Sequence, residues 1–276
     1  MNALEIRGLT KRRGDFALQG LDLTLPAGCI MGLIGENGAG KSTTIRLILN
    51  ALSRDGGTVA VYGKDNRALT PLEREDIGAV LDEVGLPEYM TALQIGRMMA
   101  GIFARWQPEV YRDYLRRLAL PEDKTFRDFS RGMKMKLGLA AALSHQPKLL
   151  LLDEATSGLD PVVRDEILTI FADFTRDEEH AVLISSHIVS DLEKICDYIA
   201  FLHKGRLLLC EEKDRLTEEY GILRGGTDGI APAAVCGRHA TPYGTEYLVR
   251  RDAVPVGMAL GQVNIEDLFV FMAKEA

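Results

Sequence analysis

The stretch Gly35–Ser42, GENGAGKS, constrains the fold of this 276-residue chain more than any other. It follows an apolar run at Ile30–Ile34 and precedes a helix that we expect over Ser42–Leu52. Its glycines let the backbone curl until successive N–H groups point into one concavity. The positive end of the helix is aimed at the same place and stabilises an anion there. The pattern GxxxxGK[ST] between a strand and a helix therefore predicts a phosphate-binding loop.

Two side chains of this loop carry chemistry. Lys41 would reach the β- and γ-phosphates of a nucleotide as a point charge, and the Ser42 hydroxyl would bind Mg²⁺. A chance glycine turn is the alternative, and the complete pattern with its flanks argues against it. We expect the nucleotide to contact the whole loop and the first helical turn, namely Gly35, Glu36, Asn37, Gly38, Ala39, Gly40, Lys41, Ser42 and Thr43.

Polar groups also follow two further apolar runs. Asp153 and Glu154 come directly after Leu149–Leu152. A carboxylate there suits a Mg²⁺ ion held largely through water, which makes Asp153 a candidate metal ligand. Glu154 is the candidate general base that would polarise an attacking water, although an acid pair that only caps a helix is the alternative. His187 closes the run Val182–Ser185 and would hydrogen-bond the γ-phosphate, although a lone histidine there is more often structural.

Continuous apolar runs indicate a buried parallel sheet and hence an α/β core. The runs are Ile30–Ile34, Gly78–Leu81, Leu149–Leu152 and Val182–Ser185. Near the N-terminus, LEIRGLT and LQGLDLTLPAG alternate apolar with polar residues, as does Thr58–Lys64. These stretches predict an antiparallel β-subdomain with one solvated face.

Between Asp82 and Gln146 the apolar residues follow a helical period, and Thr91 is a plausible N-cap. This predicts a helical subdomain inserted at about 83–146. The residues after Glu219 are rich in Gly and Ala, then GTEYLVR predicts a strand and Asn264 would cap a last helix. We therefore expect a main domain at 1–218 and a small α+β accessory module at 219–276, whose role stays open.

Bulk properties exclude several classes of protein. The net charge of −7 gives no basis for a nucleic-acid partner held by electrostatics. No apolar run approaches the ~18 residues of a membrane span, and the N-terminal segment lacks the apolar core of a signal peptide. The four cysteines of the whole chain show neither metal-ligand spacing nor the density of a disulfide framework. We expect a cytoplasmic protein with reduced thiols.

Taken in order, these motifs resemble those of the ATP-binding subunits of ABC transporters, over roughly Leu4–Arg215. GENGAGKST resembles Walker A, LLLLDE Walker B, and SSH the segment of the switch histidine. FSRGMK stands where the family has its LSGGQ signature. This signature distinguishes the family from other P-loop ATPases. The implied fold is a P-loop NTPase cassette with a RecA-like mixed sheet. The signature residues are Ser130, Arg131, Gly132 and Met133, and the D-loop residues are Ser157, Gly158, Leu159 and Asp160.

The resemblance implies an assembly. Two ATP-binding domains, in a homodimer or a heterodimer, would pair head to tail, so that Ser130 and Gly132 of one subunit close over the ATP held by the other. Lys41, Glu154 and His187 would be the catalytic residues, with ATP and Mg²⁺ as the ligands. The pore would come from permease subunits on separate chains, which would place this protein at the inner face of the cell membrane.

Departures from the family pattern refine the expectation. Arg131 and Met133 replace Gly and Gln, and SRGMK is similar to signatures in a bacterial branch that exports drugs, antimicrobial peptides or ions. Asp82 stands at the glutamine of the Q-loop and would still contact Mg²⁺ or the water. Arg13 stands at the adenine-stacking aromatic, where a guanidinium can stack, unless Phe16 takes that role; the preference for ATP over GTP stays open.

The sequence also bears on the partner of this protein and on alternative functions. The loop Asp82–Thr91, with Leu86, Pro87 and Tyr89, would help form a groove for a cytoplasmic helix of the permease. A soluble ABC-type ATPase acting on a non-transport partner is the alternative function, although the single cassette and acidic charge argue against it. A P-loop kinase or GTPase would have no use for a signature or a D-loop. The transported substrate is not encoded in this chain.

Overall fold

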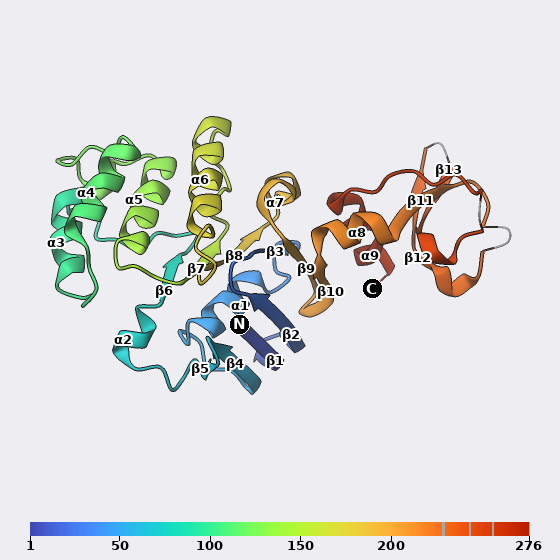
Figure 1. Cartoon of the computed structure of the whole chain (residues 1–276), viewed down its shortest axis with the longest axis horizontal. Helices are drawn as coiled ribbons and strands as arrows, with labels where there is room; N and C mark the ends of the chain where they lie inside the picture. Colours follow the sequence, from blue (N-terminus) through green and yellow to red (C-terminus); the bar gives the residue numbers. More distant parts are fainter. Residues whose placement is uncertain (228–229, 243, 256, 276) are drawn as a thin grey trace.

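The computed structural model describes residues 1–227, 230–242, 244–255 and 257–275 of the chain. Its centre is a six-stranded sheet, which has a four-stranded sheet on one side and most of the helices on the other (Figure 1). A three-stranded sheet forms the C-terminal end. Within the described ranges, no helix combines the length and the apolar character needed to cross a membrane.

The six-stranded sheet is mixed. Strands β6, β7, β8, β3 and β9 run parallel in that order, and β10 is antiparallel to β9 at the edge. The four predicted apolar strands are confirmed as β3, β6, β7 and β8, with ends within one residue, whereas β9 and β10 lie outside that prediction. The bounds are β3 Ile30–Ile34, β6 Ile77–Val80, β7 Leu149–Asp153, β8 Ala181–Ser186, β9 Tyr198–His203 and β10 Arg206–Glu212.

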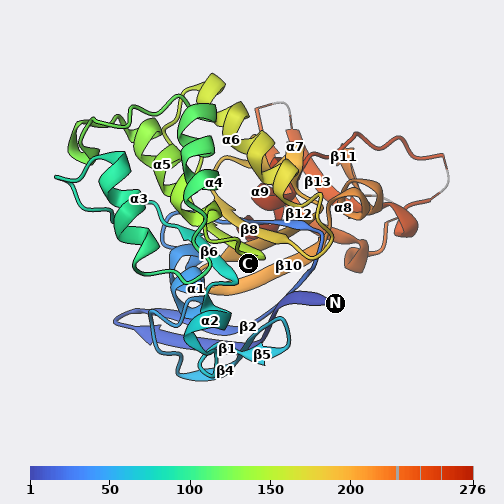
Figure 2. The same cartoon turned by 60° about the vertical axis from the view of Figure 1, so that its left-hand side comes forward.

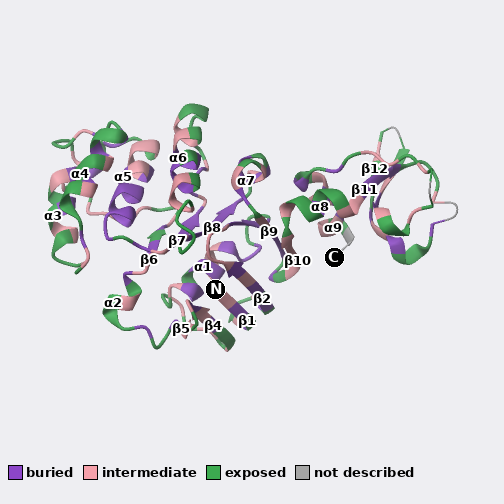
Figure 3. Cartoon of the chain, in the orientation of Figure 1, coloured by how far each residue is buried: buried purple, intermediate pink, exposed green. Residues whose placement is uncertain are grey.

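The side chains of the central strands alternate between two hydrophobic cores. In β7, Leu149 and Leu151 pack in the core that includes the four-stranded sheet and α1 (Lys41–Ile48). Leu150 and Leu152 pack in the core beneath the other helices. All four leucines are fully buried (Figure 3). Burial on both faces explains why this strand is a continuous apolar run in the sequence.

The four-stranded sheet has the order β2-β1-β4-β5 and is antiparallel throughout, as predicted. The predicted strand Thr58–Lys64 is wrong beyond Val61, because Tyr62 and Gly63 have positive φ angles of 46° and 79° and form a two-residue turn. The bounds are β1 Asn2–Arg13, β2 Phe16–Pro26, β4 Gly56–Val61 and β5 Lys64–Asp65.

The helices occupy the predicted insertion and the crossovers of the parallel sheet (Figure 2). The N-cap at Thr91 is confirmed, since its Oγ1 accepts from Gln94 N and the Gln94 side chain accepts from Thr91 N. Helix α1 ends at Ile48 and not at Leu52, and Asn50 after it has a left-handed φ of 53°. The remaining bounds are α2 Pro71–Arg74, α3 Ala92–Ala100, α4 Pro108–Arg117, α5 Arg131–Leu143, α6 Pro161–Phe174 and α7 Val189–Ile195, with a 3₁₀ turn at Phe126–Asp128.

The C-terminal residues form a sheet of order β11-β13-β12 that the last helix covers. The predicted strand at GTEYLVR is β13, and Asn264 Oδ1 accepts from Asp267 N at the start of the last helix, as expected. Strands β11 and β12 lie in the stretch that showed no clear pattern. The bounds are α8 Lys213–Glu219, β11 Tyr220–Arg224, β12 Val235–Thr241, β13 Gly244–Arg250 and α9 Ile265–Glu275, with 3₁₀ turns at Pro232–Ala234 and Arg251–Ala253.

Candidate functional site

A cleft of about 390 Å³ lies where β3, β6 and β7 end. It brings the glycine-rich loop together with Asp82 and Glu154, two of the three acids that were predicted at the nucleotide or its metal ion. Asp153 and His187 are not among its lining residues. The lining residues are Arg13, Phe16, Glu36, Asn37, Gly38, Gly40, Lys41, Ser42, Thr43, Asp82 and Glu154.

The glycines of the loop are required by its path. A Cβ atom on Gly35 would lie 2.4 Å from the Leu202 carbonyl oxygen of β9. Gly40 has a φ of 114°, and a Cβ atom there would lie 2.7 Å from the Phe16 ring. Gly40 is also the N-cap of α1, so no side chain caps the first N–H groups of this helix. Those donors face the space that a phosphate would fill.

Lys41, Glu154 and His187 form a continuous polar chain. Lys41 is buried, and its Nζ lies 2.6 Å from the Gly35 carbonyl oxygen and 3.1 Å from Glu154 Oε1. The other carboxylate oxygen of Glu154 lies 2.7 Å from His187 Nδ1. Glu154 has a left-handed φ of 52°, a conformation that costs free energy in a residue with a side chain and is common at functional sites. The backbone is held there by Ser185, whose O and Oγ accept from Glu154 N.

The predicted metal ligands differ in their accessibility. Ser42 and Asp82 line the cleft, whereas Asp153 is buried behind it and accepts a 2.6 Å hydrogen bond from Ser185 Oγ. Among the described residues, no group of three His, Cys, Asp or Glu side chains is arranged to hold a metal by itself. A hydroxyl and one or two carboxylates fit Mg²⁺, which takes most of its ligands from nucleotide phosphates and water.

The signature and the D-loop line a second cavity of about 470 Å³. Ser130 is the N-cap of α5, and its Oγ accepts from Met133 N at 3.3 Å. Asp160 caps α6 in the same way, since its Oδ1 accepts from the backbone N–H groups of two residues in the first turn. The two cavities share no lining residue, although both belong to one chain. Ser130 is therefore not placed against the nucleotide cleft of its own chain.

Some contacts at the site have no counterpart in the sequence motifs. Arg131 pairs with Asp82, with Nη2 and Oδ1 2.8 Å apart. Arg164 of α6 donates to the Leu159 carbonyl oxygen and lies 3.6 Å from the buried carboxylate of Asp191 in α7. This contact joins the D-loop to the helix that follows the switch histidine. Only the tertiary fold brings these partners together, so no local pattern signals them.

Both residues considered for adenine stacking reach the cleft. Arg13 ends β1 and Phe16 begins β2, so the turn between these strands lies at the mouth of the cleft. The Phe16 ring also lies against Gly40, which fixes its position beside the phosphate loop. The geometry therefore keeps both side chains as candidates for contact with a purine.

Comparison with known proteins agrees with this geometry. Residues 18–157 match the family model described as ABC transporter. The chain is 32% identical over 275 residues to the bacitracin transport ATP-binding protein BcrA of Enterococcus faecalis. This alignment covers 95% of this chain and 87% of BcrA. It is also 32% identical over 217 residues to the lantibiotic transport ATP-binding protein SrtF of Streptococcus pyogenes. That alignment covers 76% of this chain and 91% of SrtF.

A solved structure gives the same result for the fold. An ATP-binding subunit of an ABC transporter superposes with a TM-score of 0.69 and 26% identity, covering 78% of this chain and 92% of that one. The predicted P-loop cassette with a mixed sheet is thereby confirmed. The chain belongs to the ABC transporter family, as an ATP-binding subunit that hydrolyses ATP.

Proposed function

We propose that this subunit closes head to tail with a second ATP-binding subunit over two ATP molecules and thereby drives export through a separate membrane permease. The observation that carries the proposal is the separation of the two cavities. The phosphate loop and Glu154 line one, and the signature turn at Ser130 lines the other. If both act on one triphosphate, we infer that a second chain supplies the turn, because Ser130 does not line the nucleotide cleft of its own chain.

Symmetry then makes two equal sites. In a two-fold dimer, each chain offers its nucleotide cleft and its signature cavity to the same partner. The helix N-terminus behind Ser130 provides backbone N–H groups for the outer phosphate. Two nucleotides at the interface would hold the subunits together until hydrolysis removes the γ-phosphate.

Within each site, the chain's own residues divide the work. Lys41 would leave Glu154 when phosphates arrive, because a triphosphate attracts its ammonium group more strongly than a single carboxylate does. Glu154 is then free to polarise the attacking water, while His187 holds its second oxygen. A Mg²⁺ ion bound through Ser42, Asp153 or Asp82 would neutralise charge on the phosphates.

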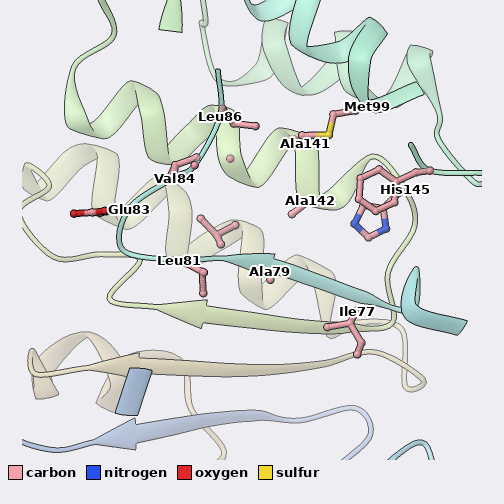
Figure 4. Close-up of a pocket in the computed structure, with 14 residues that line it drawn as sticks. Ile77, Ala79, Leu81, Glu83, Val84, Leu86, Met99, Ala141, Ala142 and His145 are labelled. Atoms are coloured by element: carbon pink, nitrogen blue, oxygen red, sulfur yellow. The ribbon is translucent and has the colours of Figure 1, made fainter. Parts of the chain in front are cut away.

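The permease would dock in an apolar groove of about 290 Å³ between β6, α3 and α5 (Figure 4). Leu86, Val84 and Met99 line it, as does His145, whose ring stacks on Phe103 with ring centroids 4.2 Å apart. Of the three loop residues expected at the groove, Leu86 lines it. Pro87 and Tyr89 do not, and Tyr89 lies exposed nearby. Such a groove suits the apolar face of a short helix.

The direction of transport rests on two lines of support. The SRGMK signature is similar to those of a bacterial branch that exports drugs, antimicrobial peptides or ions, and BcrA and SrtF carry bacitracin and lantibiotic transport in their names. We infer export of an antimicrobial peptide or a drug from a position at the inner face of the cell membrane.

Substitution in the groove tests the coupling to a permease. Leu86→Arg places a charge among apolar side chains and should abolish copurification of a multi-span membrane protein from native membranes. Leu72→Arg is the matched control, because Leu72 is exposed on α2 and does not line the groove. Retention of the same membrane protein by Leu86→Arg would contradict the assignment of the groove.

A further inference from the structure

The signature residue Arg131 is tied to the nucleotide cleft of its own chain. Arg131 begins α5 and lines the signature cavity, whereas Asp82 follows β6 and lines the nucleotide cleft. Their 2.8 Å ion pair therefore joins two cavities that otherwise have no lining residue in common. The two positions are 49 residues apart in the sequence. Both depart from the family pattern, in which neither residue would carry a charge.

The same guanidinium also contacts the D-loop. A Cβ atom on Gly158 would lie 3.2 Å from Arg131 Nη1, so the planar group lies close over this glycine. Both members of the ion pair are about half exposed, at 54% for Arg131 and 52% for Asp82. An exposed pair of this kind contributes little to the stability of the fold. It can therefore open at low cost when a stronger partner for the guanidinium arrives.

The ion pair between Lys41 and Glu154 at the cleft resembles the pair between Arg131 and Asp82, since each holds a cation against a single carboxylate. A triphosphate outcompetes a lone carboxylate for either cation, since it carries more charge and offers a guanidinium two parallel hydrogen bonds. The competition becomes more favourable inside a closed interface, where water no longer screens the charges.

We propose that Asp82 restrains Arg131 in the open chain and releases it to the triphosphate bound by the partner chain when the dimer closes. The inference rests on the proposed head-to-tail dimer and names a further device within it. Each closure then breaks one ion pair per site, so Asp82 sets the ATP concentration at which the dimer forms. Arg131 contributes part of the binding between subunits.

The two substitutions should have opposite effects. The measurement is ATP-dependent dimerisation by light scattering in a Glu154→Gln background, with EDTA present so that Asp82 cannot act through a metal ion. Asp82→Asn should lower the half-maximal ATP concentration by about two- to fivefold, the range for an exposed ion pair. Arg131→Gln should raise it. The double variant should match Arg131→Gln alone, because Asp82 acts only through the arginine.

Other outcomes would overturn the proposal. If Asp82→Asn lowers the half-maximal concentration equally with and without Arg131, the aspartate merely repels the phosphates. An unchanged concentration in both single variants would show that the ion pair has no role in closure. Failure of the parent Glu154→Gln protein to dimerise would instead contradict the proposed function itself.

A matched control comes from another ion pair. Arg117 of α4 and Asp173 of α6 lie 3.0 Å apart, are 46% and 33% exposed, and also join the helical insertion to the core. Neither residue lines the nucleotide cleft or the signature cavity. Asp173→Asn should leave the half-maximal ATP concentration unchanged, and a shift as large as that of Asp82→Asn would contradict a specific role for Asp82.

Discussion

At the scale of single residues, the site is organised by the sharing of Glu154. Its two carboxylate oxygens are engaged separately, one by Lys41 and the other by His187. This arrangement keeps the acid aimed into the cleft before any nucleotide binds, and it keeps Lys41 from standing as an unpaired buried charge. We propose that arriving phosphates would draw Lys41 away and free this carboxylate to act as the base.

Replacing this acid should separate binding from hydrolysis. Glu154→Gln keeps the shape of the side chain but removes its basicity, so we expect hydrolysis to slow by about 10²–10⁴ while ATP binding persists. Single-turnover hydrolysis and equilibrium binding of ATP measure the two effects. Glu179→Gln, at an exposed carboxylate paired with Lys148, is the control. Hydrolysis at the parent rate would assign the base to another residue.

At the scale of elements, the sequence predicts what is locally encoded. Strands β3, β7 and β8 are buried on both faces and therefore appear as unbroken apolar runs. Strand β10 is half-buried along most of its length and β12 contains a glycine under α9, so neither shows a clear period. The YIAFLH run of β9 did carry a signal, since it is apolar and precedes a turn at Lys204–Gly205.

The residues of the site likewise divide into those that a sequence motif indicates and those that only the folded chain brings together. The phosphate loop, Asp153 and Glu154 each lie inside a contiguous motif, so the sequence alone makes them candidates, and the family resemblance adds Ser130. The link between Arg131 and Asp82 depends on how α5 packs beside the strand β6. No period within either segment contains that information, which is why only the folded chain reveals it.

The groove also contains a titratable side chain with a predictable effect. Burial is the main cause that lowers the pKa of His145 below its ordinary 6.5, and its hydrogen bond to the Glu75 carbonyl oxygen only partly opposes this. The folded protein therefore resists a proton that the unfolded chain accepts. The free energy of unfolding should fall as the pH drops below about 6.5, a window above that of the carboxylates.

Urea unfolding at pH 7.5 and pH 5.5 would measure this effect. We expect the loss of stability at the lower pH to be smaller in His145→Gln, because glutamine takes up no proton and can still donate to the Glu75 carbonyl oxygen. An equal loss in the parent and in the variant would show that protonation of another group is responsible.

At the scale of the whole molecule, the C-terminal helix α9 packs on β9 and α7 of the cassette. Phe269 of α9 packs on Phe201 of β9, with ring centroids 5.4 Å apart. Glu193 of α7 accepts from Ile265 N at the start of α9. Helix α7 begins two residues after His187, so the last helix contacts the element that follows this predicted catalytic residue. We propose that 219–276 is an accessory module on the cassette at 1–218.

The central claim is that one ATP is shared by two chains. It is tested by mixing two inactive proteins, Ser130→Arg and Lys41→Ala, after each has been shown to fold by its thermal melting. A mixed dimer contains one intact site, made from Lys41 of one chain and Ser130 of the other, so ATPase activity should appear on mixing. Random pairing predicts about a quarter of the unmodified activity, if the two sites act independently. A mixture as inactive as its separate components would contradict the shared site.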